Sequence, residues 1–140
     1  MRKILVADLL NKKAMEELES IKSFEVTVKT GMKEDELSQT IPPYEAIVVR
    51  SATKVTKKVI DSAQNLKIIV RAGIGLDNID VKSAEEKGIK VANTPTATSI
   101  SVAELTLGLM LSLARRIPYA DRSMKEHRWE KKTLEGTELY

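Results

Sequence analysis

Five short apolar segments recur along the chain, and stretches with helical character separate them. The segments cover residues 4–7, 24–28, 46–49, 68–70 and 89–92. The first, third and fourth are continuous apolar runs, typical of strands buried on both faces, whereas the second alternates apolar and polar residues as an edge strand does. This alternation predicts an α/β fold with a parallel sheet and helices on both faces. For five strands, we predict the flavodoxin-like order 2-1-3-4-5.

Capping residues mark where the helices between these strands begin and end. Asn11, Thr56 and Asp80 each precede a helical pattern, and their side-chain oxygens can accept a hydrogen bond from the first turn. Gly88 follows the last of these helices, at the place where glycine commonly ends a helix. The capping pattern therefore supports helices between the first and second, third and fourth, and fourth and fifth strands.

A long apolar stretch follows the fifth strand. A polar loop containing Pro95 ends that strand, and either Ser99 or Ser101 can cap the helix that comes next. Ser101 also has the capping-box spacing to Glu104. We predict this helix over residues 102–116, with Pro118 just beyond its end. Because the helix is apolar nearly all round, we expect it to be buried on more than one side.

Composition narrows the classes of function. The chain has 140 residues, of which 42% are hydrophobic and 31% charged, as in an ordinary globular protein with a substantial core. It contains no cysteine, which excludes disulfides, thiolate metal sites and cysteine nucleophiles. The net charge is +3, but basic and acidic residues are interleaved and aromatic residues are few, so we expect no nucleic-acid partner. The apolar stretch 105–114 is too short to span a bilayer, so we expect a cytoplasmic protein without a membrane partner.

Polar groups follow three of the predicted strands. Asp8 follows the first strand, Arg50 and Ser51 the third, and Gly73-Ile74-Gly75 the fourth. Because ligands of such sheets sit beyond the carboxyl ends of the strands, we predict that these groups converge in one crevice. Arg50 and Ser51 suit a carboxylate or phosphate, although a strand-end arginine can equally pair with a neighbouring acidic residue. The glycines can form a backbone cradle for an anion or simply a tight turn.

Other chemistry has less support in the sequence. The third glycine of a GxGxxG dinucleotide motif is missing, because Asn78 occupies its place. We expect Asp77 and Asn78 to bond the loop backbone. His127 is the only histidine and lies in a charged segment, so we predict a surface residue. No group of residues has the spacing of metal ligands, and we predict no metal site.

Taken together, these motifs resemble the D-isomer-specific 2-hydroxyacid dehydrogenases, and within that family the members that act on 3-phosphoglycerate. Residues 49–56, 71–80, 91–95 and 99–105 carry the resemblance, which covers essentially the whole chain. It implies an oxidoreductase of serine biosynthesis that transfers hydride from a D-2-hydroxyacid to NAD. It also implies a homodimer or homotetramer, in which a flavodoxin-like substrate (lid) domain flanks a nucleotide domain.

The resemblance implies roles for particular residues. The substrate-binding positions of the family correspond to Arg50, Ser51, Gly73, Ile74, Gly75 and Thr98. Its cofactor-binding positions in this part of the chain correspond to Ile74, Ser99 and Val102. The arginine and the adjacent serine would face the distal anionic group of the substrate. Backbone N–H groups of the glycine loop would hold the substrate carboxylate.

The resemblance divides the chain into a lid domain over residues 1–98, a helix over 99–117 that leads toward the nucleotide domain, and a charged tail over 118–140. The family's dinucleotide loop, catalytic arginine and Glu–His pair would follow this tail. We therefore expect a truncated or isolated lid domain without catalytic residues, without tight NAD binding and without dehydrogenase activity of its own. Such a fragment would be a monomer or a dimer that exchanges the long helix. The alternative is a stand-alone flavodoxin-like module, natural or engineered, with a binding or structural role.

Overall fold

The computed structural model describes residues 1–140, which divide into two compact units, Met1–Ala97 and Thr98–Tyr140. The first unit contains a five-stranded sheet in the order β2-β1-β3-β4-β5, and every neighbouring pair of strands is parallel. This is the predicted order, with the alternating second strand at an edge. The strands are β1 (Arg2–Val6), β2 (Phe24–Val28), β3 (Ala46–Val49), β4 (Ile68–Arg71) and β5 (Lys90–Asn93).

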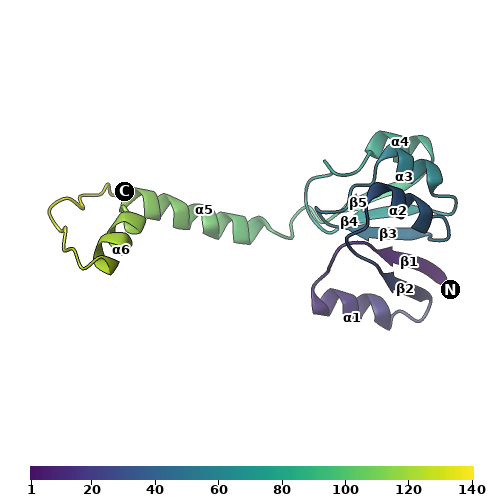
Figure 1. Ribbon diagram of the computed structural model, residues 1–140, viewed down its shortest axis with the longest axis horizontal. Coiled ribbons are helices and arrows are strands. Elements are labelled where there is room, and N and C mark those ends of the chain that lie inside the picture. Colours follow the sequence, from purple (N-terminus) through teal and green to yellow (C-terminus); the bar gives the residue numbers. More distant parts are fainter. The chain divides into compact units, whose positions relative to one another are not determined.

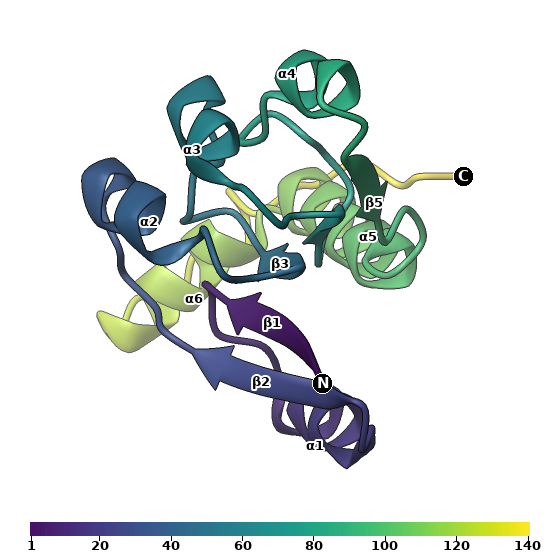
Figure 2. The same cartoon turned by 90° about the vertical axis from the view of Figure 1, so that its right-hand side faces the viewer.

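Four helices connect the strands of the first unit. They are α1 (Lys12–Ser20), α2 (Glu34–Thr40), α3 (Lys57–Ser62) and α4 (Val81–Glu86). Figures 1 and 2 show α2, α3 and α4 together on one face of the sheet and α1 on the other. The helices thus lie on both faces, as predicted, but three of the four lie on the same face.

The predicted caps are present at the starts of the helices, with one difference. Asn11 and Asp80 accept hydrogen bonds from backbone N–H groups in the first turns of α1 and α4, at 2.7 and 3.0 Å. Thr56 occupies the N-cap position of α3, but its hydroxyl donates to the carboxylate of Glu34 in α2 instead of capping α3. Gly88 ends α4 with a φ of 72°, the left-handed conformation that glycine adopts easily.

The hydrophobic core lies between the sheet and α2, α3 and α4. Leu5, Ile47 and Ile69 are register neighbours in β1, β3 and β4, and all three are fully buried. They belong to one buried cluster with residues of these helices, Leu37, Val59, Ile60 and Ala84, and with Ile41, which caps the end of α2. Because alternate strand residues face opposite sides, Ala46 and Ile68 lie on the other face, where they are only half-buried. The helix-rich face therefore supplies most of the apolar burial.

The second unit contains α5 (Ser99–Ala114) and α6 (Ile117–Lys125). The predicted caps Ser99 and Ser101 are wrong, because both lie inside α5 and Thr98 occupies its N-cap position. Arg116 has a φ of 54° and separates the two helices. Pro118 follows the end of α5, as predicted, but it also lies in the first turn of α6. Proline is tolerated there because the N–H groups of a first turn have no partner within the helix.

No residue of α5 is buried within the chain. Its exposed large apolar residues are Ile100, Val102, Leu105, Leu107, Leu109, Met110, Leu111 and Leu113. The sequence predicts burial on more than one side, and the chain alone does not provide it. The physical reason is that the second unit offers only α6 and the C-terminal segment as cover. No helix in the structure combines the length and the apolar character that crossing a membrane would require.

Candidate functional site

Four segments of the first unit meet at the carboxyl edge of the sheet. Asp8 follows β1, residues 50–53 follow β3, residues 73–75 follow β4, and Asn93 ends β5. Hydrogen bonds connect each segment to the next. The Asp8 carboxylate accepts from Arg50 N, and the Arg71 side chain donates to both Arg50 O and Gly75 O. The Asn93 amide donates to Ile74 O at 2.6 Å. The segments therefore converge at one edge of the sheet, as predicted. The single crevice is not confirmed, because the cavity at this edge is lined by Asp8 and residues 50–52 but not by residues 73–75.

The turn from Arg50 to Thr53 is held by two side chains. One carboxylate oxygen of Asp8 accepts from the N–H groups of Arg50 and Thr53 at 2.6 and 3.1 Å, and the other accepts from the Thr53 hydroxyl at 2.7 Å. The Asn78 amide donates to Arg50 O at 2.8 Å and to Thr53 O at 2.7 Å. Asn78 therefore bonds the backbone of the Arg50–Thr53 turn, whereas the prediction placed its bonds and those of Asp77 in their own glycine loop. Sequence reasoning missed the role of Thr53, because its partner is distant in the sequence.

The middle of this turn carries the unoccupied donors. The N–H groups of Ser51 and Ala52 make no hydrogen bond within the chain, and Ser51 is exposed. The Arg50 guanidinium is exposed and contacts only Leu9 O, at 3.5 Å. These groups border a cavity of about 340 Å³ lined by Asp8, Leu9, Thr30, Gly31, Arg50, Ser51 and Ala52. A guanidinium, a hydroxyl and free N–H groups at one cavity form a donor set suited to an anion.

Arg71 lies against the neighbouring glycine loop. Its guanidinium donates to Gly75 O at 2.5 Å and to Arg50 O at 3.3 Å, so it joins the two loops. A Cβ at Gly73 would lie 3.2 Å from this guanidinium, and one at Gly75 would lie 2.8 Å from the Asp77 carboxylate. Glycine is therefore needed at both positions because the Arg71 and Asp77 side chains lie close to the loop backbone. Backbone conformation does not require glycine there, since neither residue has a positive φ. Sequence reasoning missed Arg71, although an arginine that ends a buried strand beside GxG is a usable signal.

The glycine loop does not fit the pyrophosphate of a dinucleotide. In dinucleotide-binding folds, the pyrophosphate sits at the N-terminus of the helix that follows the glycines. Here the Asp80 carboxylate occupies that N-terminus, and hydrogen bonding from Ser83 holds the pKa of Asp80 below its ordinary value of 3.8. An ionised carboxylate repels phosphate at that point. Ile74, 45% exposed, offers an apolar surface that suits at most the nicotinamide ring.

Three predicted site residues belong to the second unit. Thr98 occupies the N-cap position of α5 without a side-chain capping bond, and Ser99 is the first residue of that helix. Val102 lies one turn later and is 56% exposed. Arg50, Ser51, Gly73, Ile74 and Gly75, in contrast, lie together in the first unit. The roles of Thr98, Ser99 and Val102 stay predictions.

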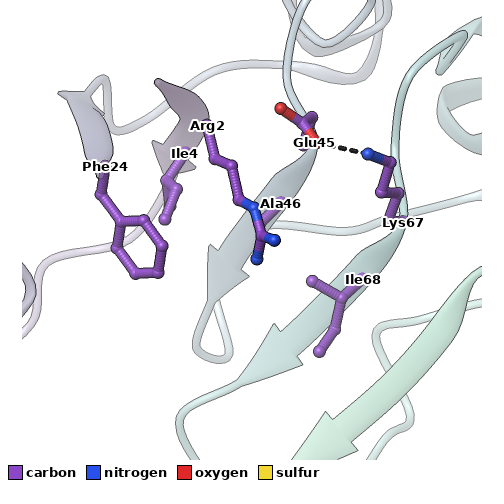
Figure 3. A pocket seen from close by; sticks show the side chains of 7 residues that line it. All are labelled: Arg2, Ile4, Phe24, Glu45, Ala46, Lys67 and Ile68. Carbon is purple, nitrogen blue, oxygen red and sulfur yellow. Dashed lines mark hydrogen bonds and ion pairs between the residues drawn. The ribbon is translucent and has the colours of Figure 1, made fainter. Parts of the chain in front are cut away.

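A separate pocket lies at the opposite, amino edge of the sheet. Figure 3 shows its lining residues, Arg2, Ile4, Phe24, Glu45, Ala46, Lys67 and Ile68. Glu45 and Lys67 form an ion pair at 2.5 Å, and this hydrogen bond lowers the pKa of the Glu45 carboxyl. The pocket includes β-strand starts, whereas the loops described above follow strand ends. It is therefore not part of the candidate anion site.

Comparison with known proteins identifies the family. The sequence model of the D-isomer specific 2-hydroxyacid dehydrogenase, catalytic domain, matches residues 4–137. The chain belongs to this family. Among its dehydrogenase relatives, it is 54% identical over 140 residues to the D-3-phosphoglycerate dehydrogenase of Methanocaldococcus jannaschii. It is 55% identical over 137 residues to the hydroxypyruvate reductase of Thermotoga maritima.

The chain spans only part of the length of these relatives. The match to the Methanocaldococcus jannaschii enzyme covers all of this chain but 26% of that enzyme. The match to the Thermotoga maritima enzyme covers 98% of this chain and 44% of that enzyme. A solved structure of NAD+-bound 3-phosphoglycerate dehydrogenase from Entamoeba histolytica superimposes with a TM-score of 0.72 and 32% identity. That match covers 81% of this chain and 39% of the other. The structural similarity therefore concerns one part of a larger dehydrogenase.

Proposed function

We propose that this chain forms the substrate-binding domain of an NAD-dependent D-2-hydroxyacid dehydrogenase that oxidises 3-phosphoglycerate. Family membership and the names of the relatives support the reaction class. The observation that carries the proposal is the pair of guanidinium groups, Arg50 and Arg71, beside free backbone donors at one edge of the sheet. A substrate with two anionic ends matches such a site.

The two loops would divide the substrate between them. The phosphate would bind at Arg50, Ser51 and Ala52, whose donors have no strong partner within the chain. The carboxylate would bind at the N–H groups of Ile74 and Gly75, because that of Gly73 already donates to Arg71 O at 2.9 Å. Arg71 would add positive charge between the two loops. Residues 1–140 would thus bind and orient the substrate, and we assign none of them a catalytic role. Another part of the protein would hold NAD, because the glycine loop does not fit its phosphates.

A second candidate follows from the relative named hydroxypyruvate reductase. Its substrate carries a neutral hydroxyl where 3-phosphoglycerate carries phosphate, so it would not need a guanidinium at that end. The identity of 55% to that relative favours this alternative as much as the 54% identity to the phosphoglycerate enzyme favours the first. The exposed guanidinium of Arg50 favours the phosphorylated substrate.

Binding of the two compounds can be compared on the 140-residue chain itself. We would titrate 3-phosphoglycerate and D-glycerate while following the amide resonances of Ser51, Ala52, Gly73 and Gly75. Half of a cleft should bind 3-phosphoglycerate with a Kd of about 1 mM, or about −4 kcal/mol. D-glycerate should bind about tenfold more weakly, because it lacks one charge-assisted contact.

Arg50→Gln should remove this preference, whereas Lys22→Gln, at an exposed lysine between α1 and β2, should retain it. Equal affinity for both compounds would favour the reductase alternative. Unchanged resonances at millimolar 3-phosphoglycerate would refute the anion site.

We also propose that α5 is covered in the full-length protein, by its other domain or by a second subunit of a homodimer or homotetramer. The exposed apolar residues of α5 support this proposal, since an apolar patch of that extent is rare on a free surface. Light scattering after size-exclusion chromatography would measure whether the 140-residue chain is a monomer or a dimer. Incubation of the chain with 3-phosphoglycerate and NAD should produce no NADH, and turnover by the pure chain would contradict the domain assignment.

A further inference from the structure

Two buried side chains bind the backbone at both ends of the turn from Arg50 to Thr53. Asp8, 6% exposed, accepts from the N–H groups of Arg50 and Thr53. Asn78, 9% exposed, donates to the carbonyl groups of the same two residues. The backbone polar groups at both ends of the turn are thereby satisfied by side chains from other segments, one after β1 and one after β4.

We propose that Asp8 and Asn78 are positioning residues that preorganise this turn for binding the phosphate end of the substrate. The inference rests on the proposed function, because it concerns the same anion site. With both ends held, the N–H groups of Ser51 and Ala52 stay free of intramolecular acceptors. A turn that is already ordered loses less conformational entropy when an anion binds than a mobile turn does.

The contacts of Asp8 indicate that its shape matters more than its charge. No lysine or arginine side chain forms an ion pair with it, and a carboxylate near an anion site repels the ligand. An asparagine can replace its contacts: the amide oxygen accepts from Arg50 and Thr53, and the amide N–H donates to the Thr53 hydroxyl. That hydroxyl then donates to Ala7 O, which already lies 3.1 Å away.

The orientation of Asn78 is fixed by its contacts. Its amide nitrogen bonds both carbonyls, while its Oδ1 is buried without a partner. Asn78→Asp has nearly the same shape but would place an oxygen against two carbonyl oxygens. This substitution should remove the restraint that the segment after β4 places on the turn, because a carboxylate oxygen repels the carbonyl oxygens of Arg50 and Thr53.

The first measurement uses the unmodified chain. Hydrogen exchange followed by NMR should find slow exchange for the amides of Arg50 and Thr53 and fast exchange for those of Ser51 and Ala52. Fast exchange at all four amides would overturn the proposal without any variant, since the ends of the turn would then be unrestrained. This outcome does not depend on whether any ligand binds.

The second measurement is the affinity of four variants for 3-phosphoglycerate. Asp8→Ala and Asn78→Asp should bind at least about tenfold more weakly, which corresponds to about 1.4 kcal/mol. Asp8→Asn should bind at least as tightly as the unmodified chain. Asn65→Asp is the matched control, because Asn65 also bonds a backbone carbonyl, that of Pro42, but lies on the surface outside the cleft. It should leave the affinity unchanged.

Unaltered affinity in Asp8→Ala and Asn78→Asp would overturn the proposal, as would an equal loss in Asp8→Asn and Asp8→Ala. If the unmodified chain does not bind 3-phosphoglycerate, the proposed function fails. Exchange at Arg50 and Thr53 in the variants then decides the positioning role alone: faster exchange in Asp8→Ala, but not in Asp8→Asn, supports it. If a variant does not fold, the exchange pattern of the unmodified chain decides whether the ends of the turn are restrained.

Discussion

Replacing Thr53 with valine keeps the shape of the side chain but removes its hydroxyl. Thr53 is 4% exposed, and the hydroxyl lies 2.7 Å from a carboxylate oxygen of Asp8 and 3.1 Å from Ala7 O. A hydroxyl has one hydrogen and donates to one acceptor at a time, so the shorter, charged contact dominates. Thr53→Val therefore leaves a buried carboxylate with one donor fewer.

The structure gives the expected size of the effect. A hydrogen bond to a charged group contributes about 1.5–3 kcal/mol, so Thr53→Val should lower the free energy of unfolding of the first unit by that amount. Thr53→Ser keeps the hydroxyl and loses one buried methyl group, which costs about 0.8 kcal/mol plus a small cavity term. Thr27→Val is the control, because the Thr27 hydroxyl makes no hydrogen bond on the half-buried edge strand β2.

Urea unfolding followed by NMR provides the assay. Trp129 lies in the second unit, so its fluorescence does not report on the first, and the amide resonances of β3 and β4 are the appropriate probe. The stability should decrease from the unmodified chain to Thr53→Ser and then to Thr53→Val, with Thr27→Val within about 0.5 kcal/mol of the unmodified chain. A Thr53→Val variant as stable as Thr53→Ser would refute the reasoning that the hydroxyl serves the Asp8 carboxylate.

Two further predictions concern the helices. Hydrogen bonding from Ser83 lowers the folded-state pKa of Asp80, so its carboxylate stabilises the first unit above the ordinary value of 3.8, and this contribution is lost as the pH falls through the lower folded pKa. Urea unfolding over a pH series should therefore find the unmodified chain more stable than Asp80→Asn well above pH 3.8, and this difference in stability should shrink below pH 3.8. A difference that does not change with pH would contradict the reasoning that the negative charge of Asp80 stabilises α4. Gly108 lies inside α5, and a Cβ added at this position would meet nothing within 4 Å, so Gly108→Ala should stabilise that helix by about 0.5–1 kcal/mol. Unfolding followed by Trp129 fluorescence measures this, and a loss of stability would mean that another surface packs closely on Gly108 in solution.

Local pattern was enough to predict most of the first unit. Apolar runs of strand length, separated by capped helical stretches, correspond to the five strands and to the caps Asn11 and Asp80. These features depend on neighbours within a few residues, which the sequence displays directly. The same reasoning failed at the start of α5, where Ser99 and Ser101 competed as caps and neither was used. Helix ends are decided by small energy differences that a local pattern does not resolve.

The sequence alone therefore determined the sheet order and placed Asp8, Arg50 and the glycine loop at one edge, because parallel strands bring their carboxyl ends together. Only the tertiary structure decided how those groups are used. The partners of Thr53, Asn78 and Arg71 belong to other segments of the chain, and their contacts exist only once β1, β3 and β4 are side by side. A hydrogen bond between distant residues depends on distance and direction in space, and the order of residues along the chain specifies neither.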